Sequence, residues 1–117
     1  QVTREYTIGA AVTALTVTEA MNKTIFVTDT ALGADCTLTL PVPRPGLEYR
    51  FVHPSTTAGT ELILDGPGTG EFWAAGAAAN TLTLVGDNTT GIRTLRCVRV
   101  TDATTDVFCY VLSGGVA

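Results

Sequence analysis

The fold of this chain is constrained most by a series of short runs in which apolar and polar side chains alternate. A cluster of turn residues ends each run. Thr, Val, Ile, Phe and Tyr fill the runs, and these residues favour strands whose side chains point alternately to two faces. Clusters of Gly, Pro, Asn and Asp, which form turns, separate the runs. We predict strands over residues 15–18, 23–28, 36–40, 48–53, 61–64, 81–85, 94–100 and 107–112.

The spacing of these strands predicts the fold class. Strands that recur about every 8–15 residues with turn signals between them are typical of an antiparallel sandwich or barrel. We therefore expect an all-β single domain over residues 15–117, an antiparallel β-sandwich or barrel-like fold of the jelly-roll or tulip type. Residues 1–14 lack a sustained period and hold Gly9 among small neighbours, so we expect them to form an N-terminal arm.

Two stretches of the chain look alike. TLTLPVPRPGLEYRFV begins at Thr37, and TLTLVGDNTTGIRTLRCV begins at Thr81. Each joins a TLTL strand to a second strand through a connector that ends in Gly, Gly46 in one and Gly91 in the other. We interpret them as two equivalent hairpins, one per sheet. A solenoid is not expected, because its repeats recur more often and keep their spacing.

Low charge and many threonines indicate a surface that is partly covered by other protein. Only 15% of the residues are charged, whereas Thr occurs 22 times. A typical domain has about 25% charged residues. We therefore expect a partner or a homo-oligomer to cover the surplus apolar surface of this chain. The formal net charge is −4 and the basic residues are scattered singly, which argues against nucleic acid. No apolar run approaches the roughly eighteen residues that span a bilayer, so no membrane partner is expected.

Residues for catalysis or metal binding are few. His53 is the only histidine, and no nucleophile motif lies near it, so we expect a capping or surface histidine. With one histidine and no CxxC spacing, the chain offers almost no ligands for a transition metal. The Asp residues lie at strand ends, where Asp commonly forms turns. We therefore expect neither a metal nor another cofactor, and no enzymatic activity.

Candidate contact residues come from two strands and from the expected arm. Arg96 and Arg99 lie on opposite faces of one predicted strand, and we expect one of them to face a subunit partner, because Arg makes forked contacts to carboxylates. Trp73 is either a core aromatic at one end of the sandwich or an exposed anchor for a sugar or a protein. The candidates in the arm are Arg4, Tyr6 and Ile8.

The run from Leu15 to Val52 resembles a recurrent pattern of phage virion proteins. On this run the chain resembles the small decoration, or cement, proteins of tailed-phage capsids and related modules of head fibres and tail fibres. The second half resembles the closing strands of the same modules. Asn22 departs from the pattern, since Gly is common there, and Phe108 and Tyr110 lie where a Trp is usual. The matching residues are Thr16, Lys23, Asp29, Thr39, Leu40, Pro41, Gly46, Tyr49 and Phe51.

The resemblance implies a virion structural protein without catalytic residues. It would be made in the bacterial host cytoplasm and would decorate the outer capsid surface, as a homotrimer bound to the major capsid protein. The alternative is a tail-fibre or receptor-binding β module that contacts a host glycan through exposed Trp73, Tyr49 and Tyr110.

We expect the three cysteines, Cys36, Cys97 and Cys109, to be small buried thiols. Synthesis in the bacterial cytoplasm would also determine their redox state. A turn centred near Ala103 would place Cys97 opposite Cys109 on adjacent strands, within reach of a disulfide. The bacterial cytoplasm is reducing, so we predict that the thiols are free.

Overall fold

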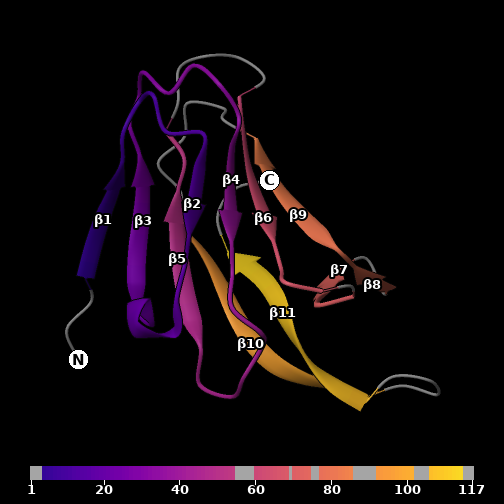
Figure 1. The fold of residues 1–117 in the computed structure, drawn as a ribbon. Coiled ribbons are helices and arrows are strands. Elements are labelled where there is room, and N and C mark those ends of the chain that lie inside the picture. The colour runs from indigo at the N-terminus through magenta and orange to yellow at the C-terminus, as the bar shows by residue number, and fades with distance from the viewer. Residues whose placement is uncertain are drawn as a thin grey trace.

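The computed structural model describes residues 4–54, 60–68, 70–74, 77–85, 92–101 and 106–114, and in these it confirms an all-β fold (Figure 1). The one helical segment described is a short 3-10 turn, η1 (Glu19–Met21). The strands are β1 (Arg4–Ile8), β2 (Ala14–Thr16), β3 (Thr24–Thr28), β4 (Cys36–Thr39), β5 (Glu48–Val52), β6 (Glu61–Asp65), β7 (Phe72–Ala74), β8 (Ala77–Ala79), β9 (Thr81–Val85), β10 (Arg93–Thr101) and β11 (Asp106–Gly114).

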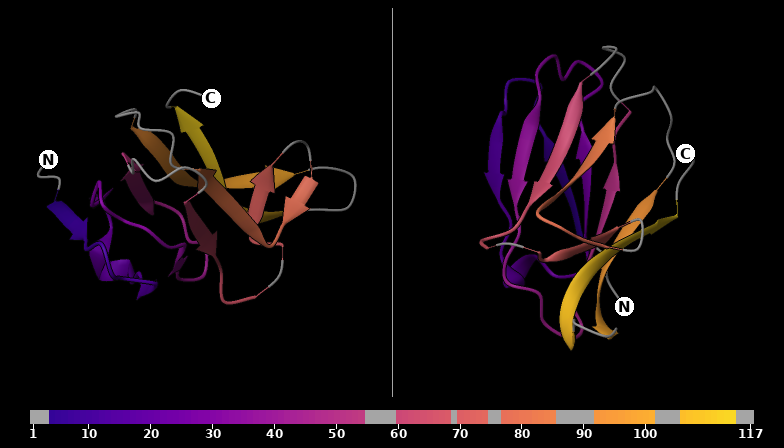
Figure 2. Two further views of the ribbon diagram at one scale, coloured as in Figure 1. Left: turned by 90° about the horizontal axis from the view of Figure 1, so that it is seen from above. Right: turned by 90° about the vertical axis from the view of Figure 1, so that its right-hand side faces the viewer.

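The strands form two sheets that pack as a sandwich-like pair (Figures 1 and 2). The large sheet has seven strands in the order β1-β3-β5-β10-β11-β7-β8, and the small sheet has four in the order β2-β4-β6-β9. Buried and partly exposed residues alternate along β3, β5 and β6, because one face of each strand packs on the opposite sheet. Phe26, Leu38, Phe51, Leu64 and Leu95 are among the core side chains between the sheets.

The first six strands alternate between the two sheets, so the predicted antiparallel arrangement is wrong for this half of the chain. β1, β3 and β5 pair in parallel in the large sheet, and β2, β4 and β6 do so in the small sheet. Each connection crosses from one sheet to the other, so the next strand in the same sheet runs in the same direction. The chain thus winds as a two-sheet coil before its second half adds antiparallel pairs, and both sheets are mixed.

Neither of the two similar stretches is a hairpin. β4 belongs to the small sheet and β5 to the large sheet, and β9 and β10 are divided in the same way. The stretches resemble each other because both carry the chain from the small sheet to the large one. In the first connector Pro41, Pro43 and Pro45 have no backbone N–H to donate to a strand ladder, which suits a crossing segment. A hairpin does form further along the chain, between β10 and β11.

Residues 4–14 belong to the sandwich and do not form a separate arm. β1 pairs with β3 over its whole length, and β2 pairs with β4. Ile8 is buried in the core with 1% of its surface exposed. The sequence pattern missed β1 because its alternation of polar and apolar residues is short, from Glu5 to Ile8, and it lies on an edge strand that buries only its last residue. Residues 1–3 of the expected arm lie outside the described residues.

Polar side chains in the core bond across the two sheets. His53 is buried, which corrects the expected surface or capping role. Its Nδ1 lies 2.8 Å from the Thr28 hydroxyl oxygen, and its Nε2 lies 3.1 Å from the Thr60 carbonyl oxygen. A carbonyl can only accept, so Nε2 carries the proton and Thr28 donates to Nδ1. His53 therefore ties β3 and β5 to the backbone that leads into β6.

The three thiols are free, as predicted, although the pairing of β10 with β11 differs from the prediction by one residue. Cys97 lies opposite Tyr110 and Cys109 lies opposite Val98, so the two cysteines point to opposite faces of the sheet. Burial raises the pKa of all three thiols, to about 11 for Cys97, where Cys109 adds to the effect. These thiols are poor nucleophiles at neutral pH.

Candidate interaction surface

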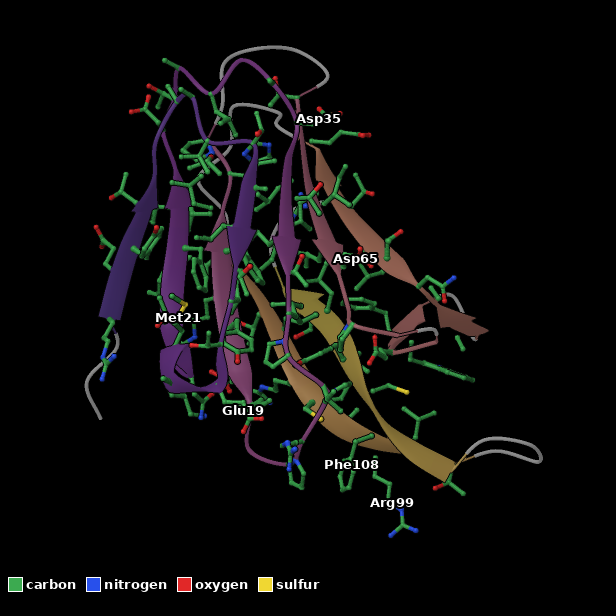
Figure 3. All side chains as sticks on the ribbon, in the orientation of Figure 1. Glu19, Met21, Asp35, Asp65, Arg99 and Phe108 are labelled. Carbon is green, nitrogen blue, oxygen red and sulfur yellow. The ribbon has the colours of Figure 1, made fainter. Side chains whose placement is uncertain are left out.

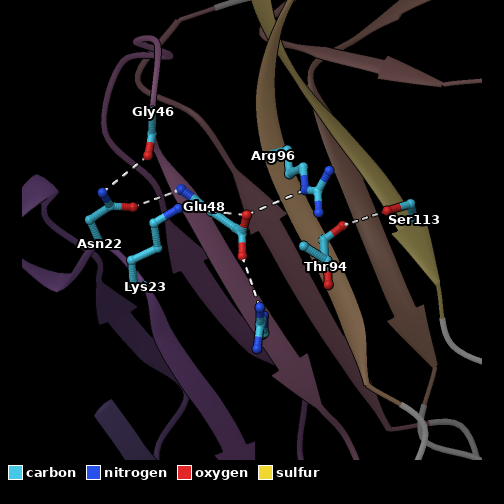
Figure 4. A network of polar contacts seen from close by, with 8 residues as sticks. Asn22, Lys23, Gly46, Glu48, Thr94, Arg96 and Ser113 are labelled. Atoms are coloured by element: carbon cyan, nitrogen blue, oxygen red, sulfur yellow. Dashed lines mark hydrogen bonds and ion pairs between the residues drawn. The ribbon is translucent and has the colours of Figure 1, made fainter. Parts of the chain in front are cut away.

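A cluster of three cations surrounds one carboxylate on the outer face of the large sheet (Figure 4). Glu48 Oε1 lies 3.7 Å from Lys23 Nζ and 3.3 Å from Arg96 Nε, and Glu48 Oε2 lies 3.2 Å from Arg50 Nη2. The side chain of Glu48 is only 14% exposed, whereas Arg96 is 62% and Arg50 is 40% exposed. Glu48 therefore holds the cations in place, and they present their remaining N–H donors to the surroundings. We call these four residues the Glu48 cluster.

The register of the strands brings the Glu48 cluster together. Arg96 of β10 lies opposite Glu48 of β5, and Thr94 lies opposite Arg50, so these side chains share one face. The backbone N–H of Lys23 donates to the Glu48 carbonyl, which places Lys23 at the near end of β3. Three segments far apart in the sequence thus meet at one carboxylate.

Asn22 fixes the turn that presents Lys23. Its Oδ1 accepts from the Glu48 N–H at 2.7 Å, and its Nδ2 donates to the Gly46 carbonyl at 3.1 Å. Lys23 has a φ of 70°, a left-handed conformation that costs a residue with a Cβ on the order of 1–2 kcal/mol. The fold therefore holds a lysine at a position where glycine would be less strained.

Charge is divided unequally between the two sheets. The strands of the small sheet contain no Lys or Arg and carry Glu61 and Asp65. The large sheet carries Arg residues on β1, β5 and β10, with Lys23 directly before β3. The Glu48 cluster has three positive charges and one negative charge in a chain whose formal net charge is −4. Its chemistry suits a partner surface that presents carboxylates, which arginine binds through paired N–H donors.

Five large apolar side chains are exposed among the described residues. The hairpin of β10 and β11 extends beyond the sandwich, and near its far end Val98 is 38% and Phe108 is 39% exposed (Figures 1 and 3). At the other edge of the large sheet, Tyr6 of β1 is 39% exposed. Val42 and Ile92, in connecting segments, are exposed singly.

The structure separates the residues that sequence reasoning grouped as contacts. Arg96 lies in the Glu48 cluster, whereas Arg99 lies on the opposite face of β10 and pairs in register with Phe108. Arg4 and Tyr6 are exposed on β1. Ile8 is in the core, so its assignment as a surface contact is wrong. Trp73 is partly buried in β7, opposite Ala78 of β8.

Sequence reasoning missed three members of the Glu48 cluster. Glu48 and Arg50 stand two residues apart in one predicted strand, so their common face was visible in the sequence. Their proximity to Lys23 and Arg96 depends on strand pairing between segments separated by more than twenty residues in the chain, which no local pattern encodes.

Two of the three aromatic residues expected at a glycan platform are buried. Tyr49 and Tyr110 have no exposed surface, and their hydroxyls donate to the carbonyls of Thr18 and Pro41. Burial and the nearby Glu19 carboxylate raise the pKa of Tyr49 to about 12, and burial likewise raises the pKa of Tyr110. Both tyrosines serve the core.

The described residues contain no group of three or more His, Cys, Asp or Glu side chains placed to hold a metal ion. In the same part of the chain no helix is long and apolar enough to cross a membrane.

Comparisons with known proteins give no match: none was found among protein-family models, curated proteins or solved structures.

Proposed function

We propose that this chain is a virion structural protein that decorates and stabilises the outer surface of a phage capsid, as a trimer bound to the major capsid protein. The observation that carries the proposal is the Glu48 cluster, a fixed cationic surface on a chain of negative net charge. Such a surface suits docking to a carboxylate-bearing protein lattice. The resemblance of residues 15–52 to decoration proteins supports the same role.

The proposed mechanism is reinforcement of the capsid lattice. A protein that binds only the assembled shell stabilises it by mass action, by about 2.7 kcal/mol per site at a free concentration of 100 times the Kd. Contacts that reach more than one capsid subunit raise the force needed to separate them. Among the described residues no buried side-chain nitrogen or oxygen lacks a hydrogen-bond partner, as expected of a part whose task is to keep its shape.

The alternative, a tail-fibre or receptor-binding module for a host glycan, has less support. Of the three aromatic residues that it would use, only Trp73 is partly exposed. Stacking on a sugar needs an accessible ring face, which Tyr49 and Tyr110 do not offer.

Co-sedimentation with capsids of the phage that encodes the chain tests the proposal. The unmodified protein should pellet with capsids, and the double variant Arg50→Gln/Arg96→Gln should bind at least tenfold more weakly. Arg44→Gln is the matched control, because Arg44 is also exposed and ion-paired, with Glu19, but does not belong to the cluster. It should bind within about twofold of the unmodified protein. Failure of the unmodified protein to bind capsids, together with binding on a glycan array, would favour the alternative.

A further inference from the structure

The outer face of the large sheet is more apolar than a sheet face that stays in water. Buried and partly exposed residues alternate along β3 and β5, so the partly exposed side chains point away from the core. A sheet with one solvated face usually carries polar residues at such outward positions. Here the outward positions include large aliphatic side chains: Ile25, Val27, Val52, Val98, Val100 and Val111.

The outer face of the small sheet follows the usual rule instead. Ile63 of β6 is the one large aliphatic side chain described on it, between Glu61 and Asp65. The other outward positions include Thr16, Thr37, Thr39, Thr81 and Thr83. Val, Ile and Thr all favour strands, so strand propensity does not explain why the large sheet carries aliphatic residues where the small sheet carries threonine. Burial of the large-sheet face by a partner explains the difference.

On the side of the β10–β11 hairpin, aliphatic residues adjoin the Glu48 cluster directly. Arg96 pairs in register with Glu48 on one side, as Figure 4 shows, and with Val111 on the other. Val98 and Val100 follow Arg96 at alternate positions of β10 and so point to the same face. Val98 is 38% exposed.

On the side of β3 and β5, aliphatic residues adjoin the cluster as well. Ile25 lies opposite Arg50 in register, and Val27 lies opposite Val52. The cations of the Glu48 cluster are therefore flanked by aliphatic side chains on two sides of one sheet face. We call the Glu48 cluster together with the six aliphatic residues of this face the mixed face.

Charge indicates the kind of partner that would cover the mixed face. Three cations share the carboxylate of Glu48, so positive charge is in excess there. The register places a further carboxylate, Glu5 of β1, on the same face, but Ile25 separates it from Arg50. A matching surface must therefore present carboxylates next to apolar groups. The small-sheet face of a second copy offers Glu61 and Asp65 among threonines, so it matches the charges but not the aliphatic side chains.

We propose that the mixed face docks on a protein surface in which carboxylates are set among aliphatic side chains. The cations of the Glu48 cluster pair with the carboxylates, and the flanking Val and Ile side chains pack on the aliphatic groups. The assignment of that surface to the capsid rests on the proposed function. The inference adds which face docks, and it adds an apolar part of the binding that salt does not screen.

Capsid sedimentation of a valine variant tests the apolar part. Val98→Thr/Val111→Thr keeps side chains that favour strands, and it replaces two methyl groups that leave water on docking by hydroxyls. It should bind capsids about tenfold more weakly than the unmodified chain. The factor should be the same at 0.05 and 0.5 M NaCl, because the cations are unchanged. Val42→Thr is the matched control, since Val42 is exposed outside the mixed face, and it should bind within about twofold of the unmodified chain.

Peptide binding to the unmodified chain tests the mixed face without capsids and without substitutions. In an NMR titration the peptide Asp-Val-Asp-Val-Asp should shift signals of β3, β5 and β10. It should bind at least threefold more tightly than Asp-Ser-Asp-Ser-Asp, which lacks the aliphatic groups, and than Lys-Val-Lys-Val-Lys, which has the wrong charge.

The outcomes separate this inference from the decoration role. Equal binding of the valine and serine peptides, shifts on other strands, or a valine variant that binds capsids like Val42→Thr would overturn the inference. A valine variant that loses subunit assembly in light scattering but keeps capsid binding would also overturn it, and would assign the face to a second copy. If the Asp-Val peptide binds the mixed face but the unmodified chain does not sediment with capsids, only the decoration role fails.

Discussion

At the scale of single residues, Lys23 combines a strained backbone conformation with a positive charge to which we assign a role in capsid binding. Its φ of 70° strains any residue with a Cβ, whereas glycine adopts it freely. Lys23→Gly and Lys23→Ala both remove the cation, but only the glycine variant relieves the strain. We expect the glycine variant to be more stable than the alanine variant by about 1 kcal/mol in chemical denaturation. Capsid binding should fall equally in both; unequal binding would mean that backbone shape, and not the charge, is recognised.

The buried tyrosines and thiols give the fold a defined weakness in alkali. Burial raises the pKa of Cys97 to about 11 from its ordinary 9.0, and that of Tyr49 to about 12 from 10.0. Above the ordinary pKa the unfolded chain has lost a proton that the folded chain keeps, so the free energy of unfolding falls as pH rises. These groups should leave the free energy of unfolding constant up to pH 9 and should lower it between pH 9 and 12.

Urea titrations at pH 8, 10 and 11 measure this loss. Tyr49→Phe removes one of the ionising groups, so the variant should lose less stability between pH 10 and 11 than the unmodified chain. At pH 8 the same variant should be less stable by about 1 kcal/mol, because it lacks the hydrogen bond to the Thr18 carbonyl. Equal losses in the two proteins would show that Tyr49 ionises as freely in the folded state as in the unfolded one.

At the scale of the element, β1 is part of the folding unit and its edge. Ile8→Ala should lower the free energy of unfolding by about 2–5 kcal/mol, because it leaves a cavity in the core. Thr7→Ala, on the exposed part of the same strand, is the control and should change stability by no more than about 0.5 kcal/mol. Thermal melts of the two variants decide the matter: if Ile8→Ala melts like the control, β1 is a detached arm after all.

The strands illustrate what a sequence of this kind encodes. Alternation located most of the core strands, since β3, β5 and β6 each bury every second residue. It says which residues share a face but not which strand lies alongside, so the parallel pairs and the crossing connections were missed. The Glu48 cluster escaped for the same reason: Arg96 was recognised as a contact residue, whereas its carboxylate partner lies on a strand brought beside it only by the fold.

At the scale of the whole molecule, the two proposed interfaces differ in physical character, and salt should separate them. The Glu48 cluster acts through exposed charges, which are screened over about 10 Å at 0.1 M and about 3 Å at 1 M ionic strength. Assembly of the proposed trimer is expected to cover exposed apolar surface, and the hydrophobic effect does not depend on opposite charges. Raising the salt should therefore release the protein from capsids before it separates the subunits.

Sedimentation with capsids and light scattering without them, both from 0.05 to 0.5 M NaCl, measure the two processes on one preparation. We expect capsid binding to weaken at least tenfold over this range while the subunit assembly changes by less than about threefold. The Arg50→Gln/Arg96→Gln variant should bind weakly throughout and lose most of the salt dependence, because the screened charges are already absent. Assembly that dissociates with salt in step with capsid release would assign both contacts to charge.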